Sequence, residues 1–319
     1  MNSLEFLLKN IAVSNFPKKK IEIKDVTNDS RKVKQGSVFI AINGYQDDGK
    51  KYIKDAVNKG ASIIISEKSI NKTKINIPVI EVNDIRKSMS KISSNYYNNP
   101  SKKLTVIGIT GTNGKTTTSF ILNSILKFSE QKTGLIGTLG AISDKINLKT
   151  NLTTPDSLEL HNILSKFVKN NIEFSIIEVS SHALSLDRVD DIDFDMAVFT
   201  NISHDHLDFH KSMKNYISVK SKLFSKLKKN GYSIINKDDK NWKTINDCTD
   251  SKVRTFSVDK KSADIRFIDW GMSIDGIMGK VKTKNEIINV NSSLIGYFNL
   301  ENILCAIACA VELNIRRQQ

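Results

Sequence analysis

Short apolar runs alternate with stretches of helical spacing along most of the chain. In the first hundred residues, the apolar runs at 37–42, 61–66 and 78–82 predict β-strands. The segments 50–60 and 85–97 repeat their apolar residues at helical intervals and predict helices. This pattern is typical of a small α/β domain.

A polar segment, NNPSKK, interrupts the pattern at residues 98–103, and its Pro100 disfavours both a helix and a central strand. We therefore predict a domain boundary here, with a first domain at 1–99 and a second domain at 100–319. Two domains agree with a chain of 319 residues.

The segment 104–110 is a near-continuous apolar run of the kind that is buried on both faces of a parallel sheet. The elements predicted after it are helices at 116–130, 157–171 and 214–231, and strands at 174–181, 195–203 and 232–238. Because strands and helices alternate, we expect a doubly wound, mostly parallel sheet, and short antiparallel strands at 250–294.

Charge restricts the partners of the protein. The formal net charge is +14, from 48 Lys and Arg against 34 Asp and Glu, but only seven of the basic residues are Arg. Specific recognition of nucleic acids relies on the bidentate contacts of Arg, and the lysines here are scattered in ones and twos. We therefore expect no nucleic-acid partner.

The cysteines and the apolar runs indicate the compartment. Cys248, Cys305 and Cys309 form no pattern of a disulfide framework or a metal site. No apolar run approaches the ~18 residues of a membrane helix. Glu5 and Lys9 interrupt the first apolar stretch, which has no small-residue cleavage site, so it does not fit a secretory leader. We expect a soluble, cytoplasmic protein without membrane insertion.

The segment GTNGKTT, from Gly111 to Thr117, follows the predicted strand at 104–110 and precedes a predicted helix. Backbone amides at such a turn can bind phosphate, Lys115 adds a positive charge, and the Thr116 hydroxyl can ligate Mg²⁺. The usual G-x4-G-K-[ST] pattern is not met, because Ile109 occupies the first glycine position. The strand–loop–helix context nevertheless predicts a phosphate loop.

Polar residues also follow two of the predicted strands. They are Glu178, Ser180, Ser181 and His182 after the first strand, and Asn201, His204, Asp205, His206, Asp208 and His210 after the second. In open α/β sheets, ligands bind at the carboxyl ends of the strands, where these residues would meet the phosphate loop. We therefore predict a site for a magnesium-bound nucleotide.

GTNGKTT, TTPDSLELH, EVSSHALSLDRV and NISHDHLDFHKSMKNYISVKSKLF occur in fixed order, between TNDSRKVKQGSVFIAINGYQDDGKKYI and GYFNLENILCAIACA. From about residue 25 to 312, the chain resembles the Mur ligases, most of all their MurE branch. The resemblance implies a small uridine-nucleotide domain and a central ATPase domain. It also implies an ATP-dependent ligase of peptidoglycan synthesis, which adds meso-diaminopimelate or L-lysine to UDP-N-acetylmuramoyl-L-alanyl-D-glutamate through an acyl phosphate. We expect a monomer.

The resemblance also implies roles for individual residues. ATP would contact Gly111, Thr112, Asn113, Gly114, Lys115, Thr116, Thr117 and, near adenine, Asn302. One Mg²⁺ would bind Thr116 and Glu178, and a second Mg²⁺ would bind His206 and Lys220, with Lys220 carbamylated by CO₂. A carbamate offers an anionic oxygen to a hard cation, which an ammonium does not. The catalytic residues would be Lys115, Glu178, His206 and Lys220.

On the substrate side, the uridine diphosphate would contact Ser30, Tyr45, Gln46 and Asp47, and the muramoyl-dipeptide would contact Thr153, Thr154, Ser180 and Arg188. Members of the family continue with a third, amino-acid-binding domain, which we expect to be absent here, so that this chain alone would be inactive in ligation. A MurF-like or folylpolyglutamate-synthase-like ligase and a non-catalytic fragment that binds ATP and a UDP-sugar stay open as alternatives.

Overall fold

The computed structural model describes residues 3–18, 20–44, 48–67 and 75–315. The chain divides into two compact units. The first unit contains residues 1–100, 156–165 and 186–192, and the second unit contains the remainder. Each unit is built around its own β-sheet.

The first unit is a five-stranded sheet in the order β1-β5-β4-β3-β2. Four strands are parallel, and β1 pairs antiparallel with β5. Its strands are β1 (Val13–Ser14), β2 (Asp25–Thr27), β3 (Ser37–Ile40), β4 (Ala61–Glu67) and β5 (Val79–Val82). Its helices are α1 (Leu4–Leu7), α2 (Ile53–Asn58) and α3 (Ile85–Tyr96), with 3-10 turns at Ser30–Lys32 and Gly49–Tyr52.

Both faces of this sheet are buried. Val38 and Ile40 of β3 pack in the cluster that includes residues of α1 and α3. Phe39, between them, points to the opposite face and packs with Ile53 and Ala56 of α2. Because alternate residues of a strand face opposite sides, a strand covered on both sides consists almost entirely of apolar residues.

The second unit is an eleven-stranded sheet in the order β16-β15-β14-β13-β12-β11-β6-β10-β7-β8-β9. The strands from β7 to β14 in this order are parallel, and antiparallel strands extend both edges. The parallel strands are β6 (Thr105–Thr110), β7 (Thr133–Gly137), β10 (Phe174–Glu178), β11 (Phe194–Phe199), β12 (Leu227–Asn236), β13 (Lys252–Ser257) and β14 (Ile265–Ser273). The edge strands are β8 (Gly140–Ile142), β9 (Asn147–Leu148), β15 (Gly276–Lys282) and β16 (Ile287–Ser292).

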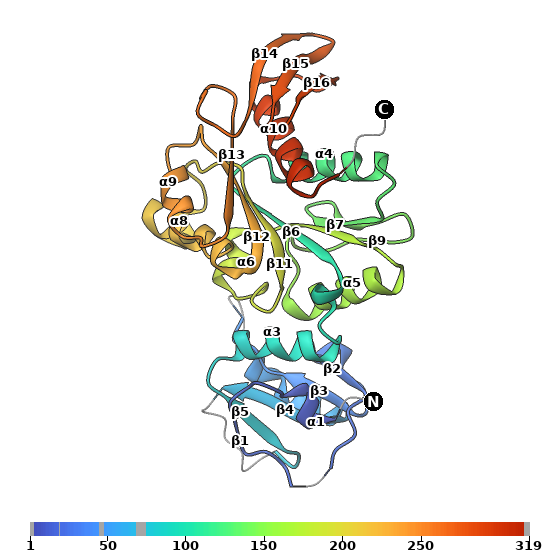
Figure 1. Ribbon diagram of the computed structural model, residues 1–319. Coiled ribbons are helices and arrows are strands. Elements are labelled where there is room, and N and C mark those ends of the chain that lie inside the picture. Colours follow the sequence, from blue (N-terminus) through green and yellow to red (C-terminus); the bar gives the residue numbers. More distant parts are fainter. Residues whose placement is uncertain (1–2, 19, 45–47, 68–74, 316–319) are drawn as a thin grey trace. The chain divides into compact units, whose positions relative to one another are not determined.

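The helices of this unit are α4 (Lys115–Phe128), α6 (Ser181–Ser185), α7 (Leu207–His210), α8 (Met213–Ser221), α9 (Trp242–Asn246) and α10 (Tyr297–Glu312). Helix α5 (Ser157–Lys169) begins in the first unit and ends in the second. Short 3-10 turns lie at Pro100–Lys103, at the junction of the two units, and at Phe224–Lys226 in the second unit. Helices α4 and α10 lie side by side on one face of the sheet (Figure 1).

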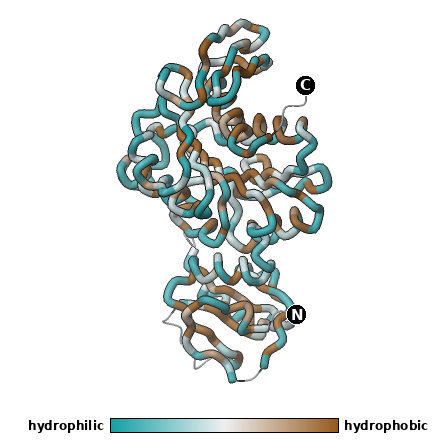
Figure 2. Tube along the Cα trace, in the orientation of Figure 1, coloured by the Kyte–Doolittle hydropathy of each residue, from teal (hydrophilic) through white to brown (hydrophobic). Residues whose placement is uncertain are grey.

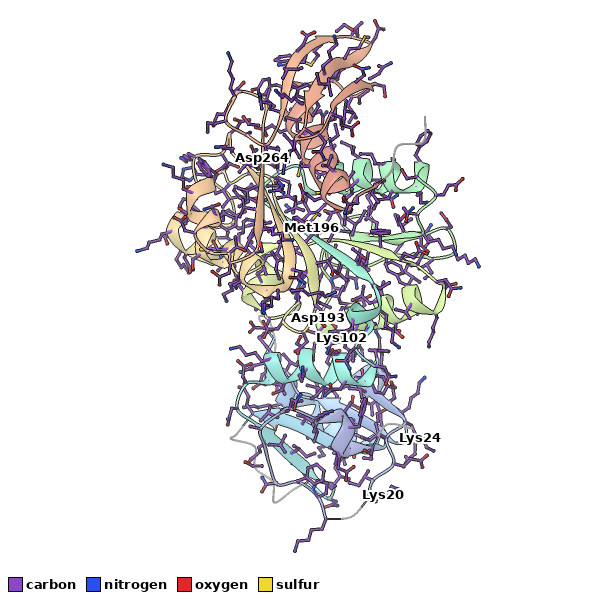
Figure 3. The ribbon with its side chains drawn as sticks, in the orientation of Figure 1. Lys20, Lys24, Lys102, Asp193, Met196 and Asp264 are labelled. Atoms are coloured by element: carbon purple, nitrogen blue, oxygen red, sulfur yellow. The ribbon has the colours of Figure 1, made fainter. Side chains whose placement is uncertain are left out.

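The main apolar cluster of the second unit lies on the face of the sheet that α4 and α10 cover. Ile107 and Ile109 of β6 pack in the cluster that includes α4 and α10. Met196 of β11 is fully buried in the same cluster and is labelled in Figure 3. Figure 2 shows hydrophobic residues concentrated on the central strands and on α10. The predicted fold class, a mostly parallel α/β sheet after a small α/β domain, is confirmed.

Two predictions are wrong. Not all strands at 250–294 are antiparallel, because β13 pairs parallel with both β12 and β14. The segment 214–231 was expected to be a single helix, but α8 ends at Ser221 and β12 begins at Leu227. Leu227 pairs with Phe194 of β11, so pairing in the sheet outweighs the helical preference of the lysines at 226–229.

Within residues 3–18, 20–44, 48–67 and 75–315, no helix is both long enough and apolar enough to cross a membrane.

Close packing at Gly134 of β7 generates a stability prediction. A Cβ at Gly134 would overlap the ring of Phe167 of α5, which is completely buried. We expect Gly134→Ala to lower the free energy of unfolding in urea by about 1–3 kcal/mol. Gly271→Ala is the matched control, since a Cβ there meets nothing within 4 Å, and its effect should stay within about 0.5 kcal/mol. Equal stability of the two variants would contradict this account of the packing.

Candidate active site

The phosphate loop connects the end of β6 to the start of α4. Gly114 has a φ of 83° and directly precedes the helix, in a left-handed conformation that glycine adopts without strain. A Cβ at Gly111 would collide with the Thr200 hydroxyl, and a Cβ at Gly114 would collide with the Asn302 amide. Both glycines are therefore required for the close approach of neighbouring side chains to the loop.

Residues after β11 hold the loop in place. The Thr112 amide donates to the Asn201 carbonyl at 2.8 Å, and the Asn113 amide donates to Asn201 Oδ1 at 3.0 Å. The Thr200 hydroxyl donates to the Asn113 carbonyl at 2.6 Å. The structure thus brings together Asn201 and the phosphate loop, as the position of both at strand ends predicts.

Two lysines converge on the carbonyl oxygen of Gly111. Lys115 Nζ donates to it at 2.9 Å and to the Thr112 carbonyl at 2.8 Å, and Lys220 Nζ donates to the Gly111 carbonyl at 2.8 Å. Lys220 is only 1% exposed. Burial lowers the pKa of Lys115 and lowers the pKa of Lys220 well below its ordinary value, and the charge of Lys115 adds to the effect on Lys220.

A buried carboxylate lies beside the loop. Glu178, at the end of β10, is completely buried and accepts a hydrogen bond from the Thr116 hydroxyl at 2.7 Å. It also accepts from the Thr138 amide at 3.2 Å and from the Thr138 hydroxyl at 3.1 Å. Gly137 makes room for it, because a Cβ there would collide with the carboxylate. One carboxylate and two hydroxyls, close to a phosphate-binding loop, form a donor set that fits Mg²⁺.

Thr138 was missed in the sequence. It directly follows β7, which is the neighbour of β10 in the sheet, and this pairing alone brings its hydroxyl to Glu178. The sequence contained an indication of its role, because Thr138 directly follows the apolar run TGLIG. Polar residues that follow apolar strands were the criterion for the other candidates.

Three predicted substrate residues lie close to Glu178 or to its partner Thr138. The Thr154 hydroxyl donates to the main-chain carbonyl of Glu178 at 2.7 Å and accepts from the Ser180 amide at 3.0 Å. The Thr153 hydroxyl lies 3.3 Å from the Thr138 hydroxyl. The predicted ATP side and part of the predicted substrate side are therefore joined through Glu178.

The other predicted substrate residues belong to the first unit. Ser30 begins a 3-10 turn, and its carbonyl accepts from Lys59 Nζ at 3.2 Å. Arg188 is partly buried, which lowers its pKa, and its carbonyl accepts from the Ser157 hydroxyl at 3.1 Å. The remaining three, Tyr45, Gln46 and Asp47, lie outside the described residues.

The predicted second cation pair comes from the segment that contains α7 and α8. His206 directly precedes α7, and its Nε2 lies 3.4 Å from the Asp205 carboxylate. Asp205 also acts electrostatically on Lys115 and Lys220, where it opposes the lowering of both pKa values. In the part of the chain that the structure describes, no three His, Cys, Asp or Glu side chains form a metal cluster of their own. Mg²⁺ in nucleotide sites needs only one or two carboxylates, with phosphate and water as further ligands.

Asn302 lies on α10 and contacts the loop. Its Oδ1 accepts from the Thr118 hydroxyl at 3.3 Å, and its amide donates to Asn299 at 2.9 Å.

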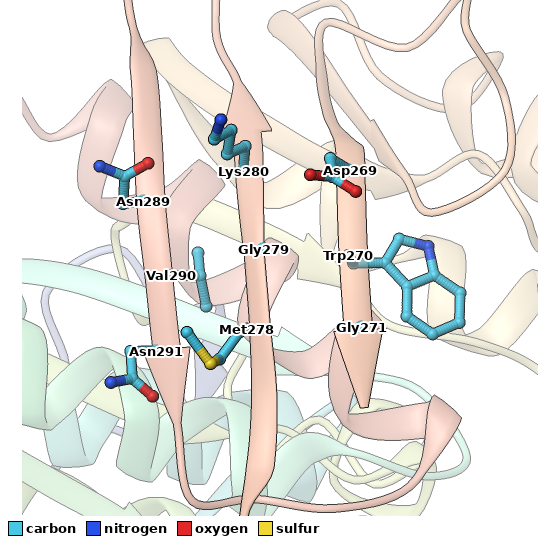
Figure 4. Close-up of a pocket in the computed structure, with 9 residues that line it drawn as sticks. All are labelled: Asp269, Trp270, Gly271, Met278, Gly279, Lys280, Asn289, Val290 and Asn291. Atoms are coloured by element: carbon cyan, nitrogen blue, oxygen red, sulfur yellow. The ribbon is translucent and has the colours of Figure 1, made fainter. Parts of the chain in front are cut away.

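A pocket of about 400 Å³ lies away from these residues, on β14, β15 and β16 (Figure 4). None of the predicted site residues lines it.

A phosphate loop at the carboxyl edge of a mostly parallel sheet, with a half-buried threonine bonded to the buried Glu178 beside it, is the arrangement typical of a nucleotide-binding domain. The chain belongs to the Mur ligase family, because the Mur ligase middle domain matches residues 109–310. The Mur ligase family catalytic domain matches residues 22–97. The predicted family resemblance is confirmed.

Curated relatives are named UDP-N-acetylmuramoyl-L-alanyl-D-glutamate–2,6-diaminopimelate ligase. The one from Caldanaerobacter subterraneus subsp. tengcongensis is 42% identical over 296 residues, with 92% of this chain and 60% of the relative covered. The one from Clostridium botulinum is 38% identical over 314 residues, with 97% and 64% covered. A solved structure of a ligase with the same name has a TM-score of 0.85 at 27% identity and covers 99% of this chain and 64% of its own. The chain thus spans about 60% of the length of the relatives.

The position of Lys115 leads to a binding prediction. We expect Lys115→Ala to weaken binding of Mg-ATP by at least about tenfold, because it removes a charged hydrogen bond worth about 1.5–3 kcal/mol. The fold should persist, since α4 keeps its apolar face. The control is Lys127→Ala at the other end of α4, where Lys127 forms an exposed ion pair with Asp144. Calorimetric titration measures both, and unchanged affinity of Lys115→Ala would refute the assignment of the loop.

Proposed function

We propose that this chain forms the UDP-substrate-binding and ATP-binding parts of a ligase that joins diaminopimelate to UDP-N-acetylmuramoyl-L-alanyl-D-glutamate in cytoplasmic peptidoglycan synthesis. The family, and the names of relatives at 38–42% identity, support this reaction. We assign residues 1–99 to the uridine substrate and residues 100–319 to ATP, in keeping with the two family matches.

The observation that carries the proposal is the double role of Glu178. Its side-chain carboxylate bonds to Thr116 of the phosphate loop, and its main-chain carbonyl bonds to Thr154 on the substrate side. Both contacts lie at the end of one strand, so a phosphate held by the loop and a carboxylate held beside Thr154 and Ser180 would be adjacent. Transfer between two groups depends on such proximity.

The proposed reaction has two steps. A carboxylate oxygen of the D-Glu residue attacks the γ-phosphorus of ATP, ADP leaves, and an acyl phosphate forms. The amine of the diamino acid then attacks the acyl carbon, inorganic phosphate leaves, and the nitrogen loses a proton. Lys115 and the amides of the loop bind the phosphates and offset the negative charge that spreads over the transferring group.

Thr116, Glu178 and the Thr138 hydroxyl would hold one Mg²⁺, and His206 and Lys220 a second. When bound, these ions neutralise phosphate charge and orient its oxygens. Of the chain's own groups, Thr116 also keeps Glu178 in place through its 2.7 Å hydrogen bond. These ligand sets rest on the family resemblance and on the contacts around Glu178 and Gly111.

Carbamylation of Lys220 forms part of the proposal. A neutral amine adds to CO₂ with formation of an N–C bond and release of one proton. Lys220 is almost completely buried beside Lys115, and these surroundings favour the neutral amine. The modified side chain would present carbamate oxygens where Nζ now contacts the Gly111 carbonyl.

Binding of the substrate gives one test. UDP-N-acetylmuramoyl-L-alanyl-D-glutamate at a hundred times its Kd should stabilise the chain by about 2.7 kcal/mol, which a rise in Tm would report. Arg188→Ala should reduce the rise strongly. Arg266→Ala is the control and should keep it, since Arg266 bonds to the Ala263 carbonyl in the second unit. No rise with this ligand, despite a rise with Mg-ATP, would leave only a nucleotide-binding function.

Carbamylation can be detected directly. The protein is exchanged into ¹³C-bicarbonate, and a carbamate carbon signal is sought by NMR. Lys220→Ala should abolish a signal that Lys222→Ala retains, because Lys222 lies on the surface two residues away. A signal that survives Lys220→Ala, or no signal in the unaltered protein, would contradict the assignment of the modified lysine.

A further inference from the structure

Four aromatic rings, which we call the row, contact one another in succession beside the phosphate loop. The ring centroids of His206 and His182 are 4.9 Å apart, at an interplanar angle of 82°. His182 lies 5.8 Å from His210, and His210 lies 4.9 Å from Tyr216. Phe209 flanks the row, 4.3 Å from His182. The row crosses three helices, α6, α7 and α8, and none of its inner rings has a role in the reaction described above.

His206, the first ring of the row, has an unfavourable backbone conformation. His206 has φ 50° and ψ 31°, a left-handed conformation that residues with a Cβ rarely adopt. Its side chain is 47% exposed. Such a conformation persists only where the surrounding structure holds it. The edge-to-face contact with His182 is a packing geometry that aromatic rings prefer, and it meets this requirement.

The other end of the row is firmly anchored. His210 is 1% exposed, and its Nε2 lies 2.9 Å from the Ser181 hydroxyl, on the helix that also carries His182. The Tyr216 hydroxyl lies 3.2 Å from the Thr112 hydroxyl of the phosphate loop. Lys220 Nζ lies 4.7 Å from the centre of the Tyr216 ring. The rings are therefore linked by contacts to the loop, to Lys220 and to His206. The charge of Asp205, the neighbour of His206 in the sequence, also acts on Lys220.

We infer that His182 is a positioning residue for the second cation: its ring holds the imidazole of His206 at a fixed place relative to Lys220. This inference rests on the proposed function, because it assumes that His206 and Lys220 bind a cation together. It assigns His182 a role through ring packing, with no proton transfer and no bond to the metal. Outer-shell partners that orient a metal ligand, usually through hydrogen bonds, change metal affinity by about 10–100-fold when they are replaced. We take the lower end of this range for a partner that acts through ring packing.

Two substitutions separate ring packing from other roles. His182→Phe keeps a flat ring and removes both nitrogens. His182→Leu gives a side chain of similar size without a ring. Phe128→Ala is the control, because Phe128 lies 73% exposed on α4 and takes no part in the site. Thermal unfolding of each variant measures any general loss of stability.

The measurement is Mn²⁺ binding, in place of Mg²⁺, by the whole chain with saturating ATP and bicarbonate, followed by electron paramagnetic resonance. The unaltered chain and Phe128→Ala should bind two Mn²⁺. His182→Leu should weaken the second Mn²⁺ at least about tenfold, whereas His182→Phe should stay within about threefold. If both His182 variants have the same lowered Tm, the expected difference between their second Mn²⁺ affinities stays the same.

Each contrary result has a distinct meaning. An unaltered second Mn²⁺ affinity in His182→Leu would overturn the inference and leave the proposed function standing. An equal loss in His182→Phe and His182→Leu would also overturn it, because the nitrogens and not the ring would then be required. Fewer than two Mn²⁺ in the unaltered chain would overturn the two-cation site itself, and the inference with it.

Discussion

The burial of one carboxylate, Glu178, constrains the site more than any other interaction. A buried charge is tolerated only where hydrogen bonds replace the lost water. Thr116 and Thr138 supply these bonds, and Gly137 leaves the space that the carboxylate occupies. Three strand ends, after β6, β7 and β10, must therefore meet at one point. The order β6-β10-β7 in the sheet meets this demand, because β10 lies between the two strands whose following loops carry Thr116 and Thr138.

The sequence predicts much of the fold because strands that are buried on both faces consist of nearly continuous apolar runs. The run at 104–110 became β6, and the helix predicted at 85–97 became α3, with bounds that differ by a single residue at one end. The failure at 214–231 has a physical cause. Lysines favour a helix locally, but the pairing of Leu227 with Phe194 involves residues 33 apart, which no local pattern contains.

The site was predictable where a motif kept its residues close in the sequence or placed them at the ends of apolar strands. Thr116 meets Glu178, and Thr154 meets Ser180, as that reasoning requires. Their roles toward ATP, Mg²⁺ and the peptide stay predictions. Thr138 escaped notice because a single threonine after a glycine-rich strand carries no motif. Lys115 folds back onto the Gly111 and Thr112 carbonyls, a contact that depends on the shape of the loop and that the motif does not indicate.

The shape of that loop has a consequence for the entropy of binding. Gly111, Thr112 and Asn113 are tied down by Asn201, Thr200 and two lysines, all of them groups of the protein itself. A loop already ordered in this way loses little conformational freedom when a polyphosphate arrives. The affinity of the loop for a polyphosphate would then be limited less by ordering of the chain than by the hydrogen bonds that Lys115 gives up. To reach a phosphate oxygen, Lys115 must leave the Gly111 and Thr112 carbonyls.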